Sequence, residues 1–224
     1  MIAATAPRFV FDLDDTLYSE RDYALSALKF AGAWIDRHLG GSNAAATLVS
    51  SFEAGNADAI GALGARLGIS QEDKARLIEE MRAHRPDISL RPDSKRLLHR
   101  IRVQDLEFSI LTDGRSVTQR AKITALGLLD ARHIVISEEI GASKPDTVGF
   151  ERIAAAAPHA SYVYVGDNPR KDFLAPNRLG WTTVMLVDRG TNIHPQQGAF
   201  EPAYLPHHRI RTLDELGEVL GQEL

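Results

Sequence analysis

The sequence contains no cysteine, so neither a disulfide nor a thiolate metal site contributes to its fold or chemistry. It also lacks a run of about 18 apolar residues, so we expect no membrane-spanning segment and no membrane partner. The opening residues MIAATAPRF have neither the charged start nor the apolar stretch of a signal peptide, and a cytoplasmic location is expected. Neither a P-loop nor the G-x-S-x-G or H-E-x-x-H motif occurs, which disfavours the chemistries that depend on them.

Charge of one sign is not concentrated anywhere in the chain. Lys and Arg number 26 and Asp and Glu number 30, giving a net charge of −4 and a pI near 6.1. Because no segment is rich in Lys and Arg, a nucleic-acid backbone is not an expected partner. The 224 residues, 44% hydrophobic and 25% charged, suit one large soluble domain or a core with an insertion.

Residues 22–85 have a helical texture, with apolar residues recurring every three or four positions. One helical face ends at two consecutive glycines and consists of Ala24, Leu25, Leu28, Ala31, Ile35 and Leu39. Further helices are predicted at 44–52, 57–67 and 71–83. Almost nothing in this stretch has strand character, so residues 19–87 are predicted to form a separate α-helical domain.

The rest of the chain alternates apolar strands with helices. A first strand is predicted at 8–14, followed after the helical stretch by strands at 107–111, 133–137, 162–165 and 182–187. The predicted helices are 93–101, with Asp93 as a candidate N-cap, and 116–126, 147–156, 170–179 and 212–220. Such alternation predicts a parallel sheet covered on both faces. The fold class is therefore α/β, a three-layer Rossmann-like core of residues 1–18 and 88–224 with an inserted α-helical cap domain.

Polar residues follow the strands of this predicted core. The sequence FVFDLDDTLY places acids directly after the first strand, and the later groups are TDG, SKP and GD with a further acid five residues on. The residues are Asp12, Asp14, Thr112, Asp113, Gly114, Lys144, Asp167 and Asp172. Open α/β sheets bind ligands at the carboxyl ends of their strands, so these groups are expected to converge in one crevice.

This combination of groups suits phosphoryl transfer. Crowded carboxylates are relieved by a hard divalent cation such as Mg²⁺, which binds carboxylates together with phosphate. One carboxylate can attack phosphorus, and a second can protonate the leaving alcohol and later activate water. The Lys144 ammonium and the Thr112 hydroxyl can stabilise the phosphoryl oxygens.

The four groups together resemble the motifs of the haloacid-dehalogenase-like (HAD) hydrolase superfamily. The first motif reads DLDDT from Asp12, the second is Thr112 in ILTDG, the third is Lys144 in ASKP, and the fourth is GDNPRKD from Gly166. Each motif alone is weak, but four in order, each after a predicted strand, are specific. The helical stretch between the first two motifs resembles the α-helical cap of the family's first cap class.

The resemblance implies a role for each acidic motif residue. Asp12 would be the nucleophile and Asp14 the general acid/base. The Asp12 carboxylate, the Asp14 backbone carbonyl and the Asp167 carboxylate would hold Mg²⁺. Asp172 would support the metal's water shell or orient Lys144.

The phosphate-binding residues implied by the resemblance are Thr112, Lys144 and the backbone N–H groups near Asp113 and Gly114. Relatives often have Asn where this chain has Asp113. An extra carboxylate there would repel phosphate unless it points away or is paired, and Arg115 is one candidate partner. Arg115 is also a candidate substrate contact.

The most direct interpretation is a Mg²⁺-dependent phosphatase that acts on a small phosphorylated metabolite, either a nucleoside monophosphate or a sugar phosphate, through an aspartyl-phosphate. Family dehalogenases and phosphonatases lack an acid at the position of Asp14. A phosphomutase would keep that acid, so it remains an alternative, as does a non-catalytic binding or regulatory protein on the same fold. The sequence leaves open whether the chain is a monomer or a homodimer.

Residues beside the motifs are weaker candidates. Tyr18 and Arg21, close to the predicted hinge, are possible substrate contacts. Asp15 is out of phase with its neighbours and is expected to be structural. Solvated loop positions are expected for His194, His207 and His208.

Overall fold

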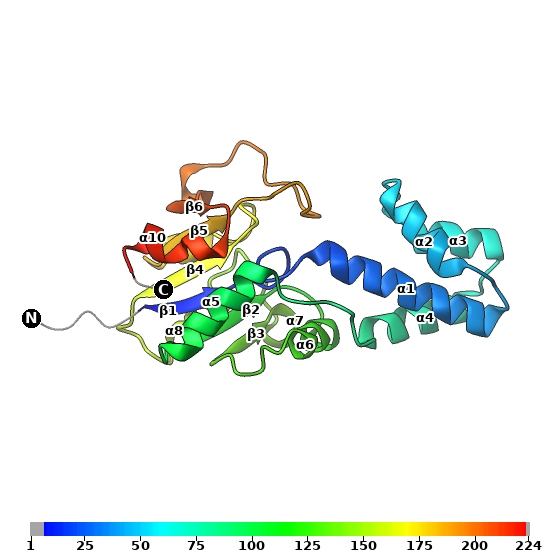
Figure 1. Cartoon of the computed structure of the whole chain (residues 1–224), viewed down its shortest axis with the longest axis horizontal. Helices are drawn as coiled ribbons and strands as arrows, with labels where there is room; N and C mark the ends of the chain where they lie inside the picture. Colours follow the sequence, from blue (N-terminus) through cyan, green and yellow to red (C-terminus); the bar gives the residue numbers. More distant parts are fainter. Residues whose placement is uncertain (1–6, 223–224) are drawn as a thin grey trace, which may run out of the picture.

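Six parallel strands form a single sheet in the computed structural model, which describes residues 7–222. The strands are β1 Arg8–Phe11, β2 Phe108–Thr112, β3 Ile134–Ile136, β4 Tyr162–Gly166, β5 Thr182–Leu186 and β6 His208–Ile210. Their order across the sheet is β3-β2-β1-β4-β5-β6 (Figure 1). The predicted parallel sheet is confirmed, although the three-residue edge strand β6 is an addition to the five strands expected.

Helices cover both faces of the sheet. The core helices are α5 Pro92–Val103, α6 Ser116–Ala125, α7 Ser137–Ile140, α8 Val148–Ala154, α9 Leu174–Arg178 and α10 Leu216–Leu220, with 3₁₀ turns η1 Pro202–Tyr204 and η2 Leu213–Glu215. Successive residues of β1 point to opposite faces, because side chains alternate along a strand. Phe9 and Phe11 join one buried cluster with α5, and Val10 joins another with α8 and α9. The three-layer α/β core is confirmed.

Two local predictions in the core are corrected. Arg91 is the N-cap of α5 and Pro92 occupies its first turn. The Asp93 carboxylate instead accepts hydrogen bonds from the Leu213 N–H and the Arg189 guanidinium, both at 3.1 Å, and so ties α5 to the C-terminal segment. The helix predicted at 170–179 is shorter, because residues 168–173 form a turn closed by the Asp172 N–H on the Asn168 carbonyl at 2.9 Å.

Four helices form the insertion between β1 and α5. They are α1 Glu20–Leu39, α2 Ala44–Glu53, α3 Ala59–Leu67 and α4 Gln71–Ala83. They share an apolar cluster of their own that includes Trp34, Leu48 and Leu77. Gly32 lets α1 and α2 approach closely, since a Cβ there would lie 2.2 Å from the Ala45 backbone. With 20 residues, α1 is about 30 Å long and carries these helices away from the sheet (Figure 1).

The two segments that connect the insertion to the core are bonded to each other. The Arg91 N–H donates to the Leu17 carbonyl at 3.1 Å, and the Asp87 N–H donates to the Ser26 hydroxyl at 2.9 Å. On the core side, the Thr118 hydroxyl of α6 donates to the Arg82 carbonyl at 3.2 Å. These contacts place the insertion beside the carboxyl edge of the sheet. Division into separate domains at 18/19 and 87/88 stays a prediction.

Within residues 7–222, no helix is long and apolar enough to span a membrane.

Candidate active site

Asp12 lies at the carboxyl end of the central strand β1 and is almost fully buried. Its N–H continues the sheet by donating to the Val165 carbonyl at 2.9 Å. The Lys144 ammonium, also buried, lies 2.9 Å from Asp12 Oδ1. Burial raises the pKa of Asp12, and Lys144 only partly offsets this, so the pKa stands at about 6.

The turn after β4 brings Asp167 and Asp172 to the same place. Asp172 accepts hydrogen bonds from the N–H groups of Asp167 and Asn168, at 3.1 and 2.7 Å, and from the Tyr164 hydroxyl at 3.0 Å. Its Oδ1 also lies 2.7 Å from the Lys144 ammonium. Burial raises the pKa of Asp172, but Lys144 and these donors outweigh it and leave that pKa below its usual range. Asp172 is therefore ionised, and both of its carboxylate oxygens accept hydrogen bonds from other groups of the protein.

Of the three buried carboxyls Asp12, Asp167 and Asp172, Asp167 has the highest pKa, so its ionised form is the least favoured. Its Oδ2 accepts a hydrogen bond from the Asn192 amide at 2.9 Å. Burial, together with the negative charges of Asp172 and Asp12, raises the pKa of Asp167 to about 9. In the absence of a cation, the folded protein therefore holds a proton on Asp167 at neutral pH.

These carboxylates fit a hard divalent cation. Asp12, Asp167 and Asp172 each offer an oxygen, and the three oxygens lie within 4.8 Å of one another. Both oxygens of Asp172 already accept protein hydrogen bonds, whereas Asp12 and Asp167 have raised pKa values that a cation would relieve. Asp12 and Asp167 are thus the suitable direct ligands, with Asp172 behind them orienting Lys144.

Asp14 has a different environment from its neighbour in the motif. Its carboxylate accepts hydrogen bonds from the Tyr18 hydroxyl, from the Lys122 ammonium at 2.7 Å and from the Gln119 amide at 2.9 Å. Burial raises the pKa of Asp14, but the Lys122 charge and these three donors outweigh burial and lower the pKa. The pKa values of the two carboxyls of the first motif are therefore shifted in opposite directions, that of Asp12 upward and that of Asp14 downward.

The second motif ends β2 beside Asp14. Thr112 is fully buried, and its hydroxyl accepts a hydrogen bond from the same Gln119 amide at 2.6 Å. The hydroxyl proton of Thr112 is thus left for another acceptor. The Gly114 N–H donates to the Ser137 hydroxyl at 2.9 Å, so binding of phosphate by this N–H would require the bond to be exchanged.

The extra carboxylate at Asp113 is paired, but not with Arg115. Asp113 Oδ1 accepts a hydrogen bond from the Lys144 N–H at 3.1 Å, and Oδ2 lies 3.7 Å from the Lys171 ammonium. Arg115 instead lies 3.6 Å from Glu138 on the surface. The cation that lies beside the Asp113 carboxylate is therefore Lys171, one residue before Asp172 in the fourth motif.

Asp15 connects the start of the insertion to the loop after β5. It is buried and accepts hydrogen bonds from the N–H groups of Glu20 and Ile193, each at 2.9 Å. The Arg91 guanidinium lies 3.7 Å away. Its backbone has a positive φ of 53°, which is uncommon for a residue other than glycine.

Tyr18 and Arg21, the candidate substrate contacts near the hinge, have partners within the protein. Tyr18 is fully buried and its hydroxyl donates to Asp14. The Arg21 guanidinium lies 3.4 Å from Glu53 and stacks over the Phe52 ring. Their contact with substrate stays a prediction, and for Tyr18 the structure adds a link to the acid/base.

A pocket of about 160 Å³ opens above these groups. Its wall contains six carboxylates and one ammonium, with the remaining positions filled by an amide and an imidazole: Asp12, Asp14, Asp15, Glu20, Asp113, Asp167, Asn168, Lys171 and His194. Burial and the Asp14 charge raise the pKa of Glu20 to about 7. Such an acidic pocket favours binding of a cation. A phosphate would be repelled by the carboxylates unless the cation were bound first.

Several pocket residues were not predicted from the sequence. Glu20, Lys171 and His194 line the pocket, while Lys122 and Gln119 of α6 donate hydrogen bonds to Asp14. His194 is exposed in a loop, as predicted, and its imidazole lies 3.8 Å from Glu20 at the rim of the pocket. Lys171 sits inside the fourth motif, and that position was the one available signal.

Comparisons with known proteins agree with this geometry. A sequence model of the haloacid dehalogenase-like hydrolase family matches residues 8–180. Ribulose-1,5-bisphosphate 5-phosphatase of Halopiger xanaduensis is 33% identical over 146 residues, which cover 62% of this chain and 60% of that protein. Phosphoserine phosphatase of Thermus thermophilus is 32% identical over 155 residues, covering 66% and 58%. The chain thus spans less than two thirds of the length of these relatives.

Solved structures share the fold over nearly the whole chain. A HAD phosphatase from Thermococcus onnurineus superposes with a TM-score of 0.62 at 23% identity, covering 97% of this chain and 99% of that one. A 2-haloacid dehalogenase from Pseudomonas syringae superposes with a TM-score of 0.65 at 22% identity, with the same coverage. Because one fold accommodates both chemistries, these likenesses establish the architecture alone.

Proposed function

Because this chain belongs to the haloacid dehalogenase-like hydrolase family, we propose that it is a Mg²⁺-dependent phosphatase acting on a small phosphorylated metabolite. One observation carries the proposal: a buried cluster of Asp12, Asp167 and Lys144 lies beside a further carboxyl, Asp14, in the same pocket. The candidate nucleophile, the candidate cation ligands and the candidate acid/base thus lie at one edge of the sheet.

The proposed metal ligands are the carboxylates of Asp12 and Asp167 and the backbone carbonyl of Asp14. When bound, Mg²⁺ would neutralise charge on the phosphoryl oxygens and lower the pKa of its carboxylate ligands. Asp172 keeps Lys144 ionised and aimed at Asp12, where the ammonium can bind a phosphoryl oxygen.

In the first proposed step, a carboxylate oxygen of Asp12 attacks phosphorus and the ester P–O bond breaks. The leaving oxygen takes a proton from Asp14, and an aspartyl-phosphate remains on Asp12. The phosphate dianion of the substrate, placed beside Asp14, raises the pKa of Asp14 and so favours its protonated form. Lys122 holds the ionised form that is needed next.

In the second step, Asp14 accepts a proton from water, and the water oxygen attacks the phosphorus of the aspartyl-phosphate. The bond between phosphorus and the Asp12 oxygen breaks, releasing inorganic phosphate and restoring both carboxyls. The tuned Asp14 thus serves as acid in one step and base in the other.

The pocket favours a compact substrate. Its volume of about 160 Å³ accommodates a phosphoryl group and a few carbon atoms. The relatives are named for ribulose-1,5-bisphosphate, phosphoserine and glyceraldehyde 3-phosphate, all short-chain esters. Both points support a sugar phosphate, or an ester of similar size, over a nucleoside monophosphate. The helical insertion, as a cap, would close over the leaving group.

The test is release of inorganic phosphate from a panel of about a hundred phosphate esters, with Mg²⁺ and with EDTA. Mg²⁺-dependent release that Asp12→Asn abolishes and Asp22→Asn, on the exposed side of α1, leaves intact is the expected result. Isomerised sugar phosphate without net release would establish a phosphomutase instead. Activity that persists in EDTA or in Asp12→Asn would refute the proposal, and no turnover of any ester would favour a binding protein.

A further inference from the structure

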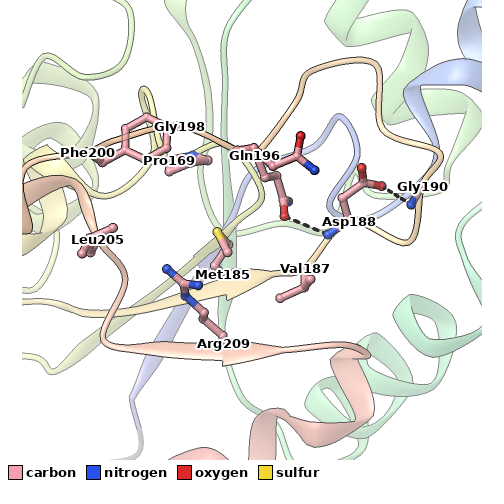
Figure 2. Close-up of a pocket in the computed structure, with 11 residues that line it drawn as sticks. Pro169, Met185, Val187, Asp188, Gly190, Gln196, Gly198, Phe200, Leu205 and Arg209 are labelled. Carbon is pink, nitrogen blue, oxygen red and sulfur yellow. Dashed lines mark hydrogen bonds between the residues drawn. The ribbon is translucent and has the colours of Figure 1, made fainter.

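A second, larger cavity lies between the carboxyl end of β5, the edge strand β6 and residues 188–205 (Figure 2). Its volume is about 540 Å³, within the range of small-molecule sites. It shares no lining residue with the acidic pocket above Asp12. The proposed phosphatase reaction uses none of its groups, so its shape and charge call for a separate explanation.

The cavity is held open by hydrogen bonds of one glutamine. The Gln196 amide donates to the carbonyls of Asp167 and Leu186, both at 2.8 Å, and its oxygen accepts the Asp188 N–H at 2.8 Å. Figure 2 shows Gln196 and Asp188 bonded along one wall. Because these bonds are internal to the protein, the cavity is preformed and a ligand would not have to order the loop.

An aromatic ring forms the opposite wall. The Phe200 ring stacks over the Arg170 guanidinium, 5.5 Å from its centroid. Gly198 leaves room for that ring, since a Cβ at this position would lie 3.1 Å from Phe200. Pro169 and Met185 contribute further apolar lining to the cavity (Figure 2). A flat apolar group would fit against this surface.

The cavity carries an uncompensated positive charge. Arg209 extends from β6 toward Met185 (Figure 2), and across residues 7–222 its guanidinium has no carboxylate within 4.0 Å. Asp188 is the one acid among the lining residues, but its Oδ1 accepts the N–H groups of Gly190, Thr191 and Asn192, at 2.7–3.1 Å. That carboxylate is directed into its own loop and leaves Arg209 available.

We propose that this cavity binds a small aromatic carboxylate, with its carboxylate on Arg209 and its ring against Phe200 and Met185. A single guanidinium matches the two oxygens and single charge of a carboxylate. A phosphate would bring more charge than one arginine balances, and the lining residues contain no lysine. The apolar walls supply the contact for the ring and exclude a purely polar ligand.

The experiment follows methionine methyl groups by NMR during titration with 2-naphthoate. The chain has three methionines, of which Met185 lines the cavity and Met81 lies in α4 of the insertion. A ring seated on Met185 should shift its methyl signal, assigned with Met185→Leu, and leave the Met81 signal unmoved. Neutral 2-naphthamide and ring-free acetate should each bind at least tenfold more weakly than 2-naphthoate.

Arg209→Gln should raise the dissociation constant for 2-naphthoate about tenfold or more, the usual loss of a charge-assisted hydrogen-bonded pair. Arg209→Lys keeps the charge but loses the paired hydrogen-bond geometry of the guanidinium. Its affinity for 2-naphthoate should therefore lie between that of the parent protein and that of Arg209→Gln. Arg37→Gln, an equal change of charge on the exposed face of α1, is the matched control and should bind normally. Unchanged near-UV circular dichroism confirms the fold of each variant.

Three results would overturn the proposal: no Met185 shift at saturating 2-naphthoate, equal affinity for 2-naphthamide, or an Arg209→Gln variant that binds as tightly as the Arg37→Gln control. All three concern binding alone, so they are independent of whether the chain hydrolyses phosphate esters.

Discussion

Replacing Asp167 with Asn should stabilise the metal-free protein at neutral pH. Burial and the neighbouring charges of Asp172 and Asp12 raise the pKa of Asp167 to about 9, whereas the carboxyl of the unfolded chain titrates near 3.8. Between these values the folded state holds a proton that the unfolded state releases. The contribution of protonated Asp167 to the free energy of unfolding is therefore fully present below pH 3.8 and is lost progressively as the pH rises toward 9.

The size of this effect follows from proton linkage. One proton released on unfolding changes the free energy of unfolding by about 1.4 kcal/mol per pH unit. Asp167→Asn removes that contribution, so its stability should fall less steeply with pH than that of the parent. The gap between the two proteins should widen by up to about 1.4 kcal/mol for each unit from pH 6 to pH 8.

Urea unfolding in EDTA measures this gap. Trp181 packs on Tyr162 in the core and Trp34 lies in the insertion, so a Trp34→Phe background reports on the core alone. Added Mg²⁺ should stabilise the parent through binding to the folded state but leave Asp167→Asn almost unchanged. Asp22→Asn removes an exposed carboxylate from α1 and is the control.

If the free energies of unfolding of the parent and of Asp167→Asn changed with pH in parallel, this reasoning would be refuted. Parallel curves would mean that Asp167 has the same pKa in the folded and unfolded states. Destabilisation of Asp167→Asn at every pH would mean that its hydrogen bond to Asn192 matters more than its buried charge. Either outcome would remove the electrostatic argument for a cation at this cluster.

The remaining predictions concern turnover. Asp14→Asn should slow hydrolysis of alkyl phosphates by roughly 10²–10⁴, and less for aryl phosphates with good leaving groups; equal losses would exclude Asp14 as the acid. Lys122→Met removes the cation that lowers the pKa of Asp14, so Asp14 should keep its proton to higher pH and the alkaline limb of the kcat/KM profile should move to higher pH; an unmoved limb would contradict this. Tyr18→Phe and Arg21→Ala should alter kcat/KM unequally across esters, and uniform losses would show that neither residue selects the leaving group.

Asp12 and Asp167 could be predicted from the sequence because each one follows a strand directly. Phe9 to Phe11 and Tyr162 to Gly166 are apolar runs, and parallel pairing places their last residues side by side. Asp12 and Asp167 therefore meet whatever the loops do. The helical insertion could also be predicted from the sequence, because apolar residues recur every three or four positions along several successive helices.

Residues that reach the site from the sides of other elements could not be predicted. Lys122 and Gln119 occupy α6 at positions that look like an ordinary polar helix face, and only tertiary packing turns them toward Asp14. Asn192 lies in an irregular loop, held by backbone bonds to Asp188 that no periodicity reveals. The edge strand β6 is only three residues long, and its sequence HRI carries no apolar alternation to detect.

The opposite pKa shifts explain how one pocket can contain so many acids. Asp14 and Asp172 have ammonium partners in Lys122 and Lys144, and their pKa values are low. Asp167 receives one amide and no cation of its own, and its pKa is high. The fold thus stabilises the ionised forms of Asp14 and Asp172, and among the described residues it gives Asp167 no ammonium or guanidinium partner. Under the proposed function, a cation would displace the proton held by Asp167, and the bound cation would in turn allow a phosphate dianion to approach this acidic pocket.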